Sequence, residues 1–167
     1  MGFYILLIEA HGWIKVGKLG RFPFDGDYLY IGSARGPGGF KRVERHLAIA
    51  AGEGKARRWH IDYLLAAGTL QAAWLIPDTS LDECELVRKL IARGAAPAIP
   101  GFGASDSECE THLLHVEGFK AAQAMLSKLA RELGLRLELK LELKPPRPGS
   151  GPDRARVTPP RSSAPAS

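Results

Sequence analysis

The chain has 167 residues and a net charge of +5, which is long enough for one domain with a substantial core and favours a polyanionic partner such as nucleic acid. Its two cysteines are too few for a disulfide framework and fit a reducing cytoplasm. No apolar run approaches the ~20 residues of a membrane span, and the apolar N-terminus lacks the charged leader of a secretory signal. We therefore expect a soluble, cytoplasmic protein without a membrane partner.

The first part of the chain predicts three short strands in an antiparallel meander. A continuous apolar run is typical of a strand buried on both faces, and the alternating segment after the turn at 10–12 is its expected hairpin partner. Residues 17–27 are expected to form a loop, with a third strand after it. The expected strands are 3–8, 13–16 and 28–31. This meander would bring Tyr4 close to Tyr30.

The rest of the chain predicts four helices and three more strands. Apolar residues at three- and four-residue steps predict helices at 40–51, 59–67, 81–92 and 119–133. Thr79 or Ser80 is the expected cap of the third helix. Strands are predicted at 70–76, 112–115 and 135–143. The sequence therefore indicates an α/β protein of the α+β type, with a small, mainly antiparallel sheet flanked by helices.

Three regions are expected along the chain. Residues 1–116 form the main domain, 117–144 a C-terminal helix–strand extension, and 145–167 a basic tail rich in proline and serine. Because the tail has almost no apolar side chains, we expect it to be disordered.

The stretch from Tyr28 to His46 combines a strand, a glycine-rich loop and a basic helix. Arg42 and His46 are four residues apart and share a helix face, so this stretch predicts a phosphate-handling site. The window from 35 to 58 carries a net +5, equal to that of the whole chain. The alternative is a solvated helix face, but the neighbouring loop and phenols favour nucleic-acid binding. The expected phosphate contacts are Arg35, Lys41, Arg45, Lys55, Arg57 and Arg58.

Four motifs in order resemble the GIY-YIG nuclease superfamily, and in particular its Uri-type branch. They are Gly2-Phe3-Tyr4, Tyr30-Ile31-Gly32, Trp59-His60-Ile61-Asp62-Tyr63 and Pro100-Gly101-Phe102-Gly103. The first carries Phe3 where the name-giving pattern has isoleucine. The resemblance covers residue 2 to about residue 116.

The resemblance implies an endonuclease that hydrolyses DNA phosphodiester bonds, with structured or damaged DNA as the expected substrate. By this likeness Tyr4 and Tyr30 are the candidate general bases, Arg42 binds the phosphate and His46 supports them. A glutamate would hold one Mg²⁺ or Mn²⁺ ion. Ionising an ordinary tyrosine at pH 7 costs about 4 kcal/mol, and Arg42 with the metal is expected to lower that cost.

Two choices follow from helix phase. Arg42 is preferred over Arg45 because only Arg42 shares a face with His46. For the metal ligand, Glu83 stands three and four residues before Leu86 and Val87 and so projects over the buried stripe, whereas Glu85 faces solvent.

Two other interpretations remain open. The fold could be a nucleic-acid-binding module that no longer cleaves. Alternatively, the loosely metal-like spacing of Cys109, His112 and His115 would suit a zinc-stabilised interaction domain. His60 and Asp62 do not face the same way, so each is expected to cap a helix or make a buried hydrogen bond.

Overall fold

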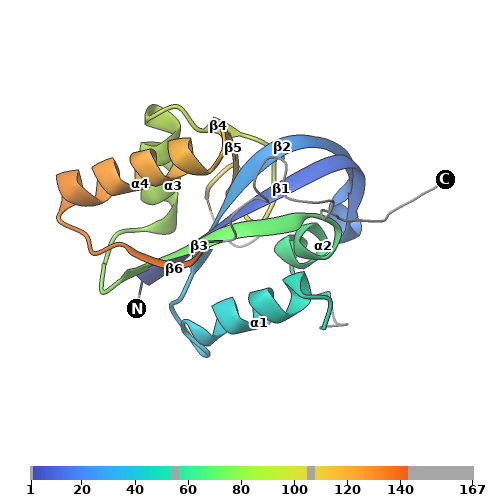
Figure 1. Ribbon diagram of the computed structural model, residues 1–167, viewed down its shortest axis with the longest axis horizontal. Helices are drawn as coiled ribbons and strands as arrows, with labels where there is room; N and C mark the ends of the chain where they lie inside the picture. Colours follow the sequence, from blue (N-terminus) through green and yellow to red (C-terminus); the bar gives the residue numbers. More distant parts are fainter. Residues whose placement is uncertain (1, 54–56, 105–107, 143–167) are drawn as a thin grey trace, which may run out of the picture.

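A computed structural model describes residues 2–53, 57–104 and 108–142. These residues form a six-stranded antiparallel sheet in the order β4-β5-β2-β1-β3-β6, with α1 and α2 on one face and α3 and α4 on the other (Figure 1). The α+β fold class with a mainly antiparallel sheet is confirmed. The strands are β1 Gly2–Val16, β2 Gly20–Ser33, β3 Thr69–Pro77, β4 Ala96–Pro97, β5 Leu113–Val116 and β6 Glu138–Glu142. The helices are α1 Lys41–Ala50, α2 His60–Ala67, α3 Glu83–Ala92 and α4 Phe119–Leu133.

The predicted meander of three short strands is wrong, because β1 and β2 form one long hairpin. The predicted turn at 10–12 lies within β1, where Gly12 pairs with Phe24. The chain reverses instead in a 3-10 turn at Gly17–Leu19, and most of the expected loop at 17–27 belongs to β2. His11 and Gly12 are exposed residues within the strand and do not mark its end. Exposed strand residues produced the false turn signal.

The apolar run of β1 divides between two cores, as expected for a strand buried on both faces. Tyr4, Leu6 and Ile8 pack in the core beneath α1 and α2. Phe3, Ile5 and Leu7 pack in the core beneath α3 and α4. Because β1 lies between β2 and β3 in the sheet, its side chains are covered on both faces.

The third helix begins later than predicted. Its N-cap is Asp82, whose Oδ2 accepts a hydrogen bond of 3.0 Å from the backbone N–H of Cys84, so neither Thr79 nor Ser80 caps it. The fourth helix has the predicted bounds. None of the described helices is long and apolar enough to cross a membrane.

The C-terminal strand β6 pairs with β3 at one edge of the sheet. It is shorter than the predicted strand at 135–143 and mostly exposed, with Leu139 46 % accessible. Leu135 and Leu137, which precede it, pack against the core under α3 and α4. The expected tail at 145–167 lies outside the described residues.

Candidate active site

A pocket of about 630 Å³ opens where the first turn of α3 faces the ends of β1 and β2. It gathers four of the five residues that the sequence analysis selected for catalysis or metal binding: Tyr4, Tyr30, Arg42 and Glu83. The other lining residues come from β2, the start of α2, α3 and the segment before β5. They are Gly32, Ser33, Arg58, Trp59, His60, Asp82, Cys84, Gly103, Glu108 and His112.

Two glycines make room for the two tyrosine rings. Tyr4 pairs with Gly32 across β1 and β2, and a Cβ atom at position 32 would lie 2.2 Å from Cζ of Tyr4. A Cβ atom at Gly103 would lie 2.9 Å from Cε1 of Tyr30, and the φ of Gly103 is +67°. Any larger residue at these positions would displace a ring from the pocket wall.

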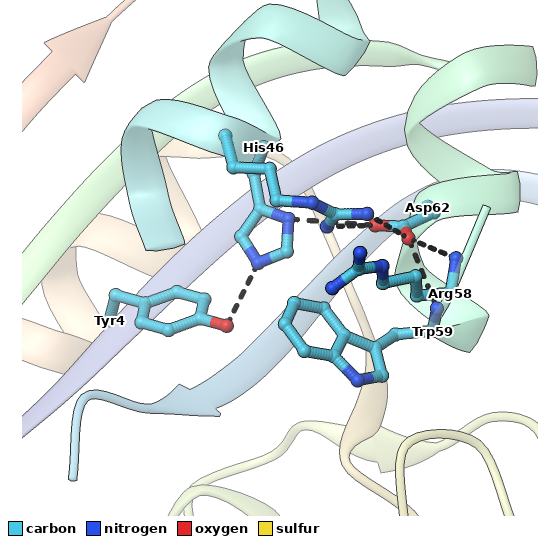
Figure 2. A network of polar contacts seen from close by, with 6 residues as sticks. Tyr4, His46, Arg58, Trp59 and Asp62 are labelled. Carbon is cyan, nitrogen blue, oxygen red and sulfur yellow. Dashed lines mark hydrogen bonds and ion pairs between the residues drawn. The ribbon is translucent and has the colours of Figure 1, made fainter. Parts of the chain in front are cut away.

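Beneath the pocket, Tyr4 leads into a buried polar chain (Figure 2). The Tyr4 hydroxyl lies 2.9 Å from Nε2 of His46, and Nδ1 of His46 lies 3.8 Å from Oδ1 of Asp62. Neither His46 nor Asp62 has any solvent-accessible surface. Among the described residues Nδ1 has no hydrogen-bond partner, so its N–H faces the Asp62 carboxylate when Nε2 accepts the Tyr4 proton.

Asp62 organises the loop before α2. Its two oxygens accept hydrogen bonds of 3.0 and 2.9 Å from the guanidinium of Arg45, and Oδ2 also accepts from the backbone N–H groups of Arg58 and Trp59. Burial raises the pKa of Asp62, but these hydrogen bonds outweigh it and hold the carboxyl below its usual range. The expected cap is therefore confirmed, whereas the position of Asp62 behind His46 was not predicted.

The protonation states of Tyr4 and His46 follow from burial. Burial raises the pKa of Tyr4 and of Tyr30 well above that of a free phenol, and Arg42 offsets only part of this rise. Arg42 therefore lowers the cost of ionising either tyrosine, as expected, but by less than burial raises it. Burial, with Arg45 and Arg42 nearby, lowers the pKa of His46 to about 4 although Asp62 opposes the shift. At neutral pH the pair is a neutral phenol beside a neutral imidazole.

Arg42 and Trp59 form the rim of the pocket. Arg42 donates hydrogen bonds to the carbonyl oxygens of Ser33 (3.0 Å) and Pro37 (3.2 Å), and a guanidinium retains further N–H groups for an anion. Trp59 is 41 % exposed, and its ring centroid lies 5.8 Å from Cζ of Arg42 and 4.8 Å from Cζ of Arg45. The rim therefore presents a flat aromatic surface beside positive charge.

The opposite wall of the pocket is acidic. Asp82, Glu83 and Glu108 line it, and Oε2 of Glu83 lies 3.3 Å from Nδ1 of His112. Glu85 is exposed and lies outside this pocket, so the helix phase that favoured Glu83 is confirmed. The pocket therefore places cations on one side and carboxylates on the other.

Part of the expected basic surface is used for internal contacts. Arg35 donates to the carbonyl oxygens of Thr79 and Leu81 and lies over the ring of Phe3. Arg45 is paired with Asp62, so the structure assigns both arginines a role within the fold rather than a free surface. Lys41 and Arg58 are exposed, Arg57 is partly buried, and Lys55 lies outside the described residues.

Three residues named in the Uri-like motifs had no predicted place in the site. The N–H of Gly103 donates to Nδ1 of His60 at 2.8 Å, so neutral His60 carries its proton on Nε2. This buried hydrogen bond was one of the two roles expected of His60. Trp59, His60 and Gly103 line the pocket because this bond joins the start of α2 to the 101–104 loop. The motif match was the only sequence signal for them.

The two cysteines are joined in a disulfide between α3 and the segment before β5. This differs from the expectation of unpaired cysteines in a reducing compartment. His112 lies beside this pair, but His115 packs against the ring of Tyr28. The predicted grouping of Cys109, His112 and His115 is therefore wrong in one member.

Of three comparisons with known proteins, one gave a match, and the matched residues cover most of the fold described above. Neither the search of curated proteins nor that of solved structures found a match. A family model described as "Domain of unknown function DUF123" matches residues 3–135, from the start of β1 to just beyond α4. The chain therefore belongs to the DUF123 family.

Proposed function

We propose that this protein is a divalent-metal-dependent endonuclease that hydrolyses phosphodiester bonds in DNA. One observation supports this most strongly: Tyr4 at the pocket wall is hydrogen-bonded to neutral, buried His46, across from Glu83. A phosphodiester needs a base for water, cations for its oxygens and stabilisation of the leaving alkoxide. The pocket contains candidates for each of these tasks.

The order of motifs supports a finer assignment to the GIY-YIG superfamily and its Uri-type branch. Tyr4, Tyr30, Arg42 and Glu83, which that likeness selects, line one pocket. Trp59, His60 and Gly103, which carry the branch-like motifs, line the same pocket. This assignment is a proposal from motif and geometry.

The proton path that we propose starts at a water molecule in the pocket. Tyr4 is too costly to ionise alone because burial raises its pKa. It instead takes the water proton as it passes its own to Nε2 of His46, 2.9 Å away. The imidazolium that forms at His46 faces Asp62, whose charge favours it. Tyr30 lines the same pocket, and its ring centroid lies 6.3 Å from that of Tyr4.

Glu83 fits a hard divalent cation. Its carboxylate is partly buried at the pocket wall, beside Asp82 and Glu108, and oxygen ligands suit Mg²⁺ or Mn²⁺. Such an ion, when bound, would stabilise negative charge on the phosphoryl oxygens and the leaving alkoxide. Arg42 would hold the phosphate from the other side.

The rim suggests that the preferred DNA has unpaired or distorted nucleotides. The exposed Trp59 ring, flanked by Arg42 and Arg45, offers a stacking surface that a base can reach only outside a regular duplex. Structured or damaged DNA in the cytoplasm is therefore the substrate and place that we propose.

The test compares wild type with Tyr4→Phe on supercoiled, single-stranded and branched DNA, with Mg²⁺, Mn²⁺ or chelator. We expect metal-dependent cleavage by wild type, greatest on the non-duplex substrates. Tyr4→Phe removes only the hydroxyl and should lower the rate by about 10²–10⁴-fold with DNA affinity retained. Cleavage by Tyr4→Phe at the wild-type rate would contradict the proton path. Tight DNA binding without cleavage on any substrate would favour the non-cleaving module instead.

A further inference from the structure

The acidic wall of the pocket also holds a sulfur and an imidazole, from Cys84 and His112, and Cys109 lies next to them. Cys84 is the second residue of α3, whereas Cys109 and His112 lie in the segment that leads into β5. The ligand atoms of all three lie within 4.8 Å of one another. Cys84 and His112 are buried and Cys109 is partly buried, so little of this group is exposed at the surface.

We propose that Cys84, Cys109 and His112 form a zinc site that is available only when the Cys84–Cys109 disulfide is reduced. In the structure the two sulfurs are bonded to each other, and the Cα atoms are 5.3 Å apart. Reduction would therefore leave two thiols near each other and near the imidazole. The same pair of sulfurs can hold either a bond or a metal ion.

The chemistry of the switch balances as follows. A dithiol or phosphine reductant gives two electrons to the S–S bond, which breaks, and the two sulfurs take up two protons from the dithiol or from water to form two thiols; the reductant leaves as a disulfide or a phosphine oxide. Zn²⁺ then displaces the two thiol protons to solvent as two Zn–S bonds form, and a ring nitrogen of His112 supplies a third ligand. In the oxidised protein no thiolate is available for this step.

The donor set is the reason for choosing zinc. Thiolate and imidazole together suit Zn²⁺ far better than Mg²⁺ or Mn²⁺, which prefer carboxylate and water oxygens. Three protein ligands would leave a fourth position for water. Glu83 lies 3.3 Å from Nδ1 of His112, and a carboxylate next to a metal-binding imidazole commonly orients it.

The proposed zinc site contacts the pocket through Glu83, but none of its three ligands takes part in the proposed cleavage chemistry. Cys84 follows Glu83 in the first turn of α3, and His112 contacts Glu83 directly. Either the disulfide or the metal would hold the segment around Cys109 against α3. Exchange between the two states would therefore be transmitted to the Glu83 carboxylate.

The test measures zinc in the purified full-length protein, with no DNA present. One sample is reduced with a phosphine and one is kept oxidised; each is incubated with Zn²⁺, desalted and analysed for metal. We expect one zinc ion per reduced chain and none per oxidised chain. Replacing Zn²⁺ by Co²⁺ should give a thiolate-to-cobalt absorption band only in the reduced sample. Equal zinc in both samples, or none in the reduced one, would overturn the proposal.

Matched histidine variants test the third ligand. His112→Gln should weaken zinc binding by about tenfold or more, measured by competition with a coloured chelator. His115→Gln should leave it unchanged, because His115 packs on Tyr28 instead. Equal losses in both variants would count against the assigned ligand set. Circular dichroism checks that each variant is folded, and the comparison of reduced with oxidised wild type does not depend on any variant.

Discussion

Asp62 is a fully buried carboxylate, and the guanidinium of Arg45 balances its charge. Arg45 was expected to contact DNA, and it lies instead against both oxygens of Asp62. A buried charge without its partner is strongly destabilising. We therefore expect Arg45 to stabilise the fold.

Arg45→Ala should lower the free energy of unfolding by about 3 kcal/mol, because it strips a buried carboxylate of its only charged partner among the described hydrogen bonds. Urea denaturation followed by tryptophan fluorescence measures the change. Arg58→Ala is the control. Arg58 binds Asp62 through its backbone N–H, which the variant keeps, and its side chain is exposed. We therefore expect the free energy of unfolding to fall by less than about 0.5 kcal/mol. Similar stabilities for the two variants would contradict the structural role of Arg45.

His46 should make stability depend on pH. Its pKa is about 4 in the folded protein against about 6.5 in an unfolded chain, so the unfolded state binds more protons between these values. The contribution of His46 to the free energy of unfolding is fully present above about pH 6.5. It is lost as the pH falls towards 4, and the total loss is about 3 kcal/mol. Urea unfolding at pH 4.5–7.5 should give a steeper slope for wild type than for His46→Gln. Parallel slopes would show that His46 does not carry this dependence.

At the level of single residues, the sequence predicted those members of the site that sit on regular patterns. Arg42 and Glu83 follow from helix phase and motif, and both line the pocket. Asp62 and His112 were not predicted as neighbours of Tyr4 and Glu83, because their positions depend on how α2 and the segment before β5 pack on the sheet. No local spacing encodes that packing.

Among the elements, the first turn of α3 places the two glutamates that were compared as metal ligands in different surroundings. Glu83 faces the pocket and Glu85 faces solvent, although only one residue separates them. The two carboxylates thus form a matched pair on one helix.

Glu83→Gln should lower metal-dependent cleavage by about a hundredfold or more, since metal stabilisation is worth several kcal/mol. The melting temperature should hardly change, because the amide has nearly the same shape as the carboxylate and Glu83 is only partly buried. Glu85→Gln should be silent in both measurements. A dead Glu85→Gln enzyme beside an active Glu83→Gln enzyme would reverse the assignment of the ligand.

Helices were predicted better than strands for a physical reason. The four predicted helices are all present, because each has one buried stripe that repeats every three or four residues. The β1–β2 hairpin was missed because its exposed end carries His11 and Gly12, which look like a turn in the sequence. Only the pairing with the facing strand shows that β1 continues through them, with Gly12 at a φ of +84°.

For the molecule as a whole, charge is divided across the pocket rather than spread over a basic face. Cationic groups come from α1 and the loop before α2, and carboxylates come from α3 and the segment before β5. Arg35 and Arg45 are engaged within the fold, so fewer cations remain for DNA than the charge count suggested.

The salt dependence of DNA binding should show which of the cations contact phosphates. Contact with about four phosphates predicts a slope of log affinity against log salt near −3.6, and Arg58→Ala should make it shallower by about 0.9. Arg35→Gln should leave the slope unchanged, because Arg35 is bonded to backbone carbonyls. Fluorescence anisotropy over a range of salt concentrations measures all three proteins. A wild-type slope near zero would argue against any nucleic-acid partner.

The wide separation of the pocket residues along the chain has a consequence for biosynthesis. Tyr4, Arg42 and His46 leave the ribosome well before Glu83 and His112, at a synthesis rate of about 5–20 residues per second. β1 also lacks one of its two neighbours until β3 has been made. The nascent chain therefore holds a phenol, an imidazole and a guanidinium but no opposing carboxylate wall. If the proposed function holds, competence for phosphoryl chemistry would arise only after the segment that carries His112 has been made and packed against α3.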